Sequence, residues 1–189
     1  VTGVQTCALP IYTVTFYSFK GGVGRTTALI HVAWILAQRG RKVVAVDLDL
    51  EAPGLSTAFS LQPEPPIFGL VDYFYERAYM PEHKIQIGEI FGEVNVPNAT
   101  GRLFIVPSGE LNLNYIAKID DLRATSLTTE GETLWSVFVK DIKRHLNPDF
   151  ILVDSRTGLN QWGAFSLLQA ADESVIFLFP NDQIGRAHV

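Results

Sequence analysis

The segment from Lys20 to Thr27 is rich in glycine and has the composition of a loop that binds phosphate groups. Glycines let the backbone turn sharply and bring its N–H groups against phosphate oxygens. Apolar residues recur at helical spacing from Thr26 onwards, so the positive end of a helix would point at the same place. We therefore expect a nucleotide's phosphates to be contacted by Gly21, Gly22, Val23, Gly24, Arg25, Thr26 and Thr27.

Two positions of this loop depart from the ordinary P-loop pattern G-x-x-x-x-G-K-[ST]. Phe19 stands where the first glycine belongs, and Arg25 stands where the lysine belongs. A guanidinium is broader than an ammonium group and directs two donors toward phosphate. Arg25 can therefore bind β- and γ-phosphate oxygens, whereas its effect on hydrolysis stays open. Thr26 supplies a hydroxyl at the place where Mg²⁺ would sit between the phosphates.

Three aspartates follow apolar segments that have the composition of buried strands. Asp47 and Asp49 follow Val43–Val46, and Asp154 follows Phe150–Val153. In an open α/β sheet, ligands bind beyond the carboxyl ends of the strands. The alternation of strand side chains would place Asp47 and Asp49 on one face. A carboxylate in the position of Asp154 would hold Mg²⁺ through water.

Strands and helices are expected to alternate along the chain. The predicted strands cover 12–18, 43–46, 103–106, 150–153 and 174–179. The predicted helices cover 26–39, 70–77, 132–146 and 162–171, whereas 80–101 is predicted to be irregular. This order indicates an α/β fold with an open, mostly parallel sheet and helices on both faces, the three-layer α/β/α arrangement of P-loop NTPases.

Composition narrows the classes of protein. The chain has 189 residues, of which 47% are hydrophobic, and this fits one globular domain. The net charge of −5 argues against broad, charge-driven binding to nucleic acids or membranes. No apolar run is long enough to cross a bilayer. The single cysteine, Cys7, permits no internal disulfide, which suits the cytoplasm.

Both ends of the chain resemble translated sequencing-adapter DNA rather than natural protein. We therefore expect residues 1–11 and 184–189 to be foreign and 12–183 to form a single P-loop nucleotide-binding domain. On this interpretation the domain is a fragment that is truncated at its C-terminal side.

The loop from Lys20 to Thr27 resembles the deviant Walker A loop, K-G-G-x-G-K-[ST], of the ParA/MinD ATPases in the SIMIBI class of P-loop NTPases. It matches a variant with arginine in place of the second lysine. The resemblance extends through 46–49 and through 153–158, and so covers most of the chain. It implies that ATP and Mg²⁺ bind here and that two subunits close around ATP as a homodimer, with Lys20 reaching the partner's phosphates.

The same resemblance implies roles for further residues. Asp49 would orient or activate the attacking water, and Asp47 would support Mg²⁺ through water, as would Asp154. The backbone N–H of Gly158, in a second switch loop, would contact the γ-phosphate, and Asn181 would hydrogen-bond the adenine.

Three functions remain open from the sequence. The first is an ATP-hydrolysing dimerisation switch that signals to an unknown protein partner or a fused C-terminal domain. The second is an ATP-sensing module with little hydrolysis, which Arg25 suggests. The third is a phosphotransferase similar to the bacterial tyrosine kinases on the same scaffold, which usually carry an ordinary lysine where Arg25 stands.

Overall fold

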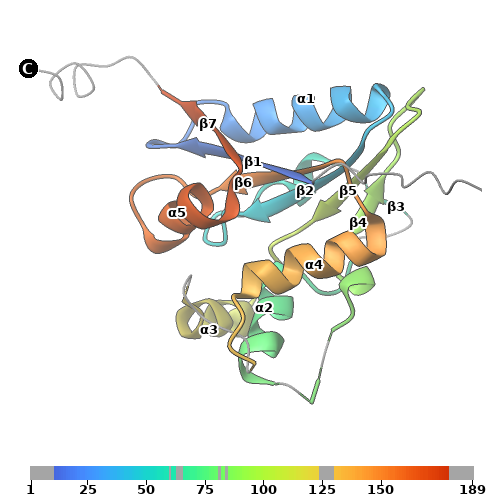
Figure 1. Ribbon diagram of the computed structural model, residues 1–189. Helices are drawn as coiled ribbons and strands as arrows, with labels where there is room; N and C mark the ends of the chain where they lie inside the picture. The colour runs from blue at the N-terminus through green and yellow to red at the C-terminus, as the bar shows by residue number, and fades with distance from the viewer. Residues whose placement is uncertain are drawn as a thin grey trace, which may run out of the picture.

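The computed structural model describes residues 11–59, 61–62, 66–80, 82–83, 85–123 and 130–178 (Figure 1). The strands are β1 (Tyr12–Ser18), β2 (Lys42–Leu48), β3 (Leu61–Gln62), β4 (Gly92–Val94), β5 (Arg102–Val106), β6 (Phe150–Ser155) and β7 (Glu173–Phe177). The α-helices are α1 (Arg25–Gln38), α2 (Leu70–Tyr79), α3 (Leu113–Asp121), α4 (Leu134–Leu146) and α5 (Gln161–Phe165). Short 3-10 turns cover η1 (Ser56–Ala58) and η2 (Ile87–Glu89), and a π-helix covers η3 (Ser166–Ala170).

The described strands form one sheet in the order β3-β4-β5-β2-β6-β1-β7. Strands β5, β2, β6, β1 and β7 pair in parallel, whereas β3 and β4 add an antiparallel edge. Helix α1 covers one face, and α2 and α4 cover the other (Figure 1). The predicted α/β fold class, an open and mostly parallel sheet between two helical layers, is confirmed.

Strand β2 explains why the central strands are apolar throughout. Its residues Val43 and Ala45 pack in the cluster under α1, and Val44 and Val46 pack in the cluster under α2 and α4. A strand buried on both faces needs a continuous apolar run rather than an alternating pattern. The two cores therefore fix the strand between them, and the strand's carboxyl end is fixed with it.

The region predicted to be irregular contains more structure than its sequence indicates. Turn η2 lies there, and so does β4, which pairs antiparallel with β5 from Gly92 opposite Ile105 to Val94 opposite Leu103. A strand of three residues is too short to produce a recognisable alternation. Its stability comes from the neighbouring strand, which local sequence does not reveal.

Helix α3 was not predicted, and the last helix has a different form. In α3, Tyr115 is buried while Leu113 is 87% exposed, so the apolar residues do not mark one buried face. Asn112 caps this helix by accepting a hydrogen bond from the N–H of Tyr115. The segment predicted as one helix over 162–171 is α5 followed by the π-helix η3.

The described part of the chain holds no helix with the length and apolar character needed to span a membrane.

Gly101 joins the end of α1 to the start of β5 by close backbone contact. Its N–H donates to the carbonyl oxygen of Ala37 at 3.0 Å. A methyl group on Gly101 would lie 2.2 Å from the carbonyl oxygen of Arg41 and 2.7 Å from that of Ala37. Both obstacles are backbone atoms, which cannot turn aside as a side chain can.

We therefore predict that Gly101→Ala lowers the free energy of unfolding by about 3 kcal/mol, the upper range for overpacking. Urea denaturation would measure the change. Gly88→Ala is the matched control, because the nearest atom to its new methyl group is a side-chain carbon of His145 at 3.3 Å. Equal stability of the two variants would contradict the close packing of α1 on β5.

Candidate functional site

The glycine-rich loop connects β1 directly to α1 at the carboxyl edge of the sheet. Gly22 and Gly24 have φ values of 75° and 83°, in the left-handed region that favours glycine. No atom lies within 4 Å of the place where a side chain would start at Gly21, Gly22 or Gly24, so the loop faces open space. A pocket of about 330 Å³ there is lined by Ser18, Gly21, Gly22, Val23, Gly24, Arg25, Thr26, Thr27, Asp49, Ala52 and Thr157.

The start of α1 is suited to an anion. Gly24 occupies the N-cap position, no side chain caps the helix, and the first turn carries no acidic residue. The N–H groups of a helix's first turn lack partners within the helix and carry its positive dipole end. The geometry of the loop and of this helix end therefore suits phosphate oxygens.

Arg25 is buried, lines this pocket and binds two carboxylates. Its Nε donates to Oδ1 of Asp154 at 2.6 Å, and its Nη2 donates to Oδ2 of Asp49 at 3.0 Å. Its Nη1 is buried and has no hydrogen-bond partner. The sequence predicts that the Arg25 guanidinium contacts phosphate, whereas in this structure it binds Asp49 and Asp154. Its Nη1 group is still available to donate a hydrogen bond.

Thr26 and Asp154 bring a hydroxyl and a carboxylate together. The Thr26 hydroxyl donates to Oδ2 of Asp154 at 2.7 Å. Burial raises the pKa of the Asp154 carboxyl, and the charge of Arg25 with the Thr26 hydrogen bond opposes that rise. Hydroxyl and carboxylate oxygens are the ligands that Mg²⁺ prefers, so these two side chains fit a magnesium ion at the phosphates.

Asp47 holds the loop that follows β2. It is fully buried, and its carboxylate accepts hydrogen bonds from the backbone N–H groups of Asp49, Gly54 and Leu55. Burial raises its pKa to about 7, against the lowering effect of these three bonds. Strand β2 ends at Leu48, so strand alternation does not govern Asp49, whose carboxylate turns to Arg25 instead.

Gly158, in the loop between β6 and α5, has a φ of 79°. Its N–H donates to the carbonyl oxygen of Ser18 at 3.2 Å. The same loop is joined to the loop that follows β2 by an ion pair between Arg156 and Glu51. Glu51 has no role in the predictions from sequence, and its pairing with a residue 105 positions later leaves no local signal.

The structure thus brings four predicted site residues into direct contact: Arg25, Thr26, Asp49 and Asp154. Asp47 lies opposite Asp154 in the pairing of β2 with β6. Lys20 is exposed at the start of the loop. Asn181 lies outside the described residues.

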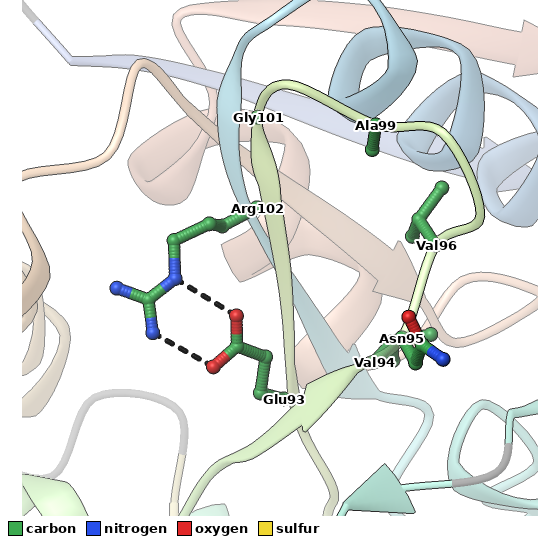
Figure 2. A pocket seen from close by; sticks show the side chains of 7 residues that line it. All are labelled: Glu93, Val94, Asn95, Val96, Ala99, Gly101 and Arg102. Atoms are coloured by element: carbon green, nitrogen blue, oxygen red, sulfur yellow. Dashed lines mark hydrogen bonds and ion pairs between the residues drawn. The ribbon is translucent and has the colours of Figure 1, made fainter.

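A larger hollow of about 500 Å³ lies at the amino end of β5, beside the hairpin that β5 forms with β4 (Figure 2). Arg102, at the amino end of β5, donates from Nε and Nη2 to the two carboxylate oxygens of Glu93 at 2.8 and 2.7 Å. These charges neutralise each other, and no glycine-rich loop borders the hollow. The smaller pocket is the better candidate for a phosphate ligand.

Comparison with known families matches residues 11–182 to AAA_31, described as an AAA domain. The chain belongs to this family. It is 31% identical over 171 residues to a Rhizobium rhizogenes protein described as a candidate replication protein A, which covers 88% of this chain and 40% of that protein. It is 27% identical over 163 residues to the septum site-determining protein MinD of Escherichia coli K12, covering 86% of this chain and 51% of MinD.

The fold has a close counterpart among solved structures. MinD from Pyrococcus horikoshii OT3, complexed with Mg-ADP, superposes with a TM-score of 0.68 at 22% identity, over 94% of this chain and 65% of that one. Together these likenesses make the chain a ParA/MinD-like P-loop NTPase, in a family of ATPases. The chain spans about half the length or less of the curated relatives reported above.

The raised pKa of Asp47 predicts a dependence of stability on pH. Between the ordinary pKa of 3.8 and about 7, the native state keeps a proton that the unfolded state has lost. The free energy of unfolding should therefore fall as pH rises through this range and level off above it. The contribution lost from Asp47 is on the order of 4 kcal/mol.

Asp47→Asn removes this contribution, because the amide does not titrate. Urea denaturation of both proteins from pH 5 to pH 8 gives the difference in their pH slopes, in which the other titrating groups cancel. The wild type should lose stability more steeply than the variant up to about pH 7. Parallel curves would contradict the burial of an ionisable carboxyl at Asp47.

Proposed function

We propose that this domain binds and hydrolyses ATP with Mg²⁺ and works as a dimerisation switch. The observation that supports it most strongly is the cluster of Arg25, Thr26, Asp49 and Asp154 beneath the open face of the glycine-rich loop. One cation, two carboxylates and backbone N–H groups converge at one edge of the sheet, as phosphoryl transfer to water requires.

Each part of the cluster has a role in this proposal. The loop from Gly21 to Thr27 receives the phosphates on its N–H groups. Thr26 and Asp154 would hold Mg²⁺, which neutralises charge on the β- and γ-phosphate oxygens when it is bound. Asp47 keeps the following loop in place through its three backbone hydrogen bonds and so positions Asp49.

Arg25 changes partners when the triphosphate arrives. A phosphate group competes with Asp49 and Asp154 for the guanidinium, and the unpaired Nη1 supplies a donor that needs no prior release. Asp49, once released, can accept a hydrogen bond from the water that attacks the γ-phosphate. The loop after β2, which carries Glu51, and the second switch loop, which carries Arg156, would transmit the change, since an ion pair joins them.

Lys20 and the dimer complete the proposal. Lys20 is exposed at the mouth of the loop, where a second subunit's phosphates could be reached. The output would go to a partner protein or a fused C-terminal domain in the cytoplasm, and residues 12–183 would act as one nucleotide-binding domain. The Mg-ADP held by the similar MinD from Pyrococcus horikoshii supports the choice of ligand.

The first test removes two side chains, one at a time: the carboxylate of Asp49, which is proposed to orient the attacking water, and the amine of Lys20, which is proposed to reach the partner subunit's phosphates. We predict that Asp49→Asn lowers ATP turnover about 100-fold or more while Mg-ATP still binds, because general-base or orienting groups contribute that much. Lys20→Ala should lower turnover and also abolish ATP-dependent dimers in sedimentation velocity experiments. Phosphate release measures turnover in each case.

Lys140→Ala is the control, because Lys140 is an exposed lysine that pairs with Glu132 on the other helical layer. It should turn over ATP as the wild type does. If Asp49→Asn and Lys20→Ala both hydrolyse ATP as fast as the wild type, the proposed mechanism is wrong.

The second candidate function, ATP sensing with little hydrolysis, is favoured by one observation: Arg25 engages both Asp49 and Asp154. Such a buried pair could keep Asp49 from the attacking water even when nucleotide is bound. The two functions differ in what a lysine at position 25 would do.

The hydrolysis proposal predicts that Arg25→Lys slows single-turnover hydrolysis, about tenfold, because one ammonium cannot make the forked contacts of a guanidinium. It also predicts a lower free energy of unfolding, by about 1–3 kcal/mol, because one buried carboxylate loses its partner. Arg144→Lys is the control, since Arg144 is largely exposed. A large gain in hydrolysis would instead favour the sensing function.

A further inference from the structure

Gly158 is held at both of its backbone polar atoms by the end of β1. Its N–H donates to the carbonyl oxygen of Ser18 at 3.2 Å, and its carbonyl oxygen accepts from the Tyr17 hydroxyl at 3.0 Å. Tyr17 and Ser18 are the last two residues of the strand that leads into the phosphate loop. The second switch loop is thereby fastened to the strand just before the phosphate site.

The Tyr17 side chain is fixed in the position that this contact needs. It is 1% exposed, and its ring meets the Phe19 ring edge to face at 5.2 Å. Gly163 leaves room for it: a methyl group there would lie 3.3 Å from the Tyr17 ring and 2.9 Å from the Gly158 carbonyl oxygen. A buried hydroxyl requires a hydrogen-bond partner, and the Gly158 carbonyl is the partner here.

Asn160 reinforces the same loop conformation. Its Nδ2 donates to the carbonyl oxygens of Thr157 and Gly158, at 2.9 and 3.3 Å, while its Oδ1 caps α5 at Gly163. The loop therefore has one well-defined arrangement in this structure. In that arrangement the N–H of Gly158 is already used by Ser18.

We propose that Tyr17 is a positioning residue that holds the second switch in its phosphate-free position and so sets the discrimination between ATP and ADP. This rests on the proposed function, in which the Gly158 N–H turns to the γ-phosphate. ATP must break the hydrogen bonds of Gly158 to Ser18 and Tyr17 before it gains that contact. ADP has no γ-phosphate, so it binds with these bonds intact.

The cost of breaking these hydrogen bonds therefore lowers the affinity for ATP and not the affinity for ADP. When the binding-competent state is only partly populated, the apparent affinity is reduced by that fraction. A ligand shifts such an equilibrium only by its differential affinity for the two states. Removing the Tyr17 hydroxyl destabilises the phosphate-free arrangement of the second switch loop. It should therefore raise the affinity for ATP but not the affinity for ADP.

Tyr17→Phe tests this directly, because it removes the hydroxyl and keeps the ring. Calorimetry with Mg²⁺ and a non-hydrolysable ATP analogue should show affinity raised about threefold to tenfold, the weight of one hydrogen bond. Affinity for Mg-ADP should stay within about twofold on the same argument. Tyr73→Phe is the matched control: it removes the hydroxyl of another buried tyrosine, bonded to Asp141 at 2.6 Å, and should leave both affinities unchanged.

Amide hydrogen exchange in the nucleotide-free protein provides a second readout. The Gly158 amide should exchange faster in Tyr17→Phe than in the wild type or in Tyr73→Phe, because its loop opens more easily. If Tyr17 had a purely structural role, Tyr17→Phe would lower the free energy of unfolding without changing the ratio of the affinities for the ATP analogue and ADP.

The possible outcomes separate this inference from the function on which it rests. If the wild type binds both nucleotides and the ratio in Tyr17→Phe is unchanged or falls, the role of Tyr17 is wrong and the proposed function stands. If the wild type binds neither nucleotide, the proposed function is wrong and the role of Tyr17 is wrong with it.

Discussion

The site depends on one buried guanidinium placed between two carboxylates. Asp154 is 1% exposed and Asp49 is 8% exposed, and ionised carboxylates in such surroundings are strongly destabilised unless a cation pairs with them. Arg25 supplies that cation from the first turn of α1, with bonds of 2.6 and 3.0 Å. Without it, two buried negative charges would face each other beneath the phosphate loop.

This pairing is possible only because of the strand order. Strands β2, β6 and β1 are neighbours and run in parallel, so their carboxyl ends meet at one edge. Helix α1 follows β1 through the glycine-rich loop and packs on one face of the sheet, while α2 and α4 pack on the other (Figure 1). The two cores hold the strands, and the strands bring together Arg25, Asp49 and Asp154.

Local features of this fold could be predicted from the sequence, and contacts between distant residues could not. Strand β1 has its predicted bounds, and α1 begins within one residue of its prediction, because both follow from local periodicity and glycines. Strand β4 and helix α3 were missed because pairing and capping stabilise them more than composition does. The phosphate loop was recognised, yet nothing local indicates that Arg25 binds Asp154, which lies 129 residues away.

Binding of a nucleotide's phosphates between the glycine-rich loop and these carboxylates can be followed by ¹⁵N NMR during titration with Mg-ATP. The amide signals of Gly21–Thr27, Asp49 and Asp154 should shift first and most, because these residues line or support the 330 Å³ pocket. Shifts confined to the hollow around Glu93 and Arg102, or no shifts at millimolar Mg-ATP, would contradict it.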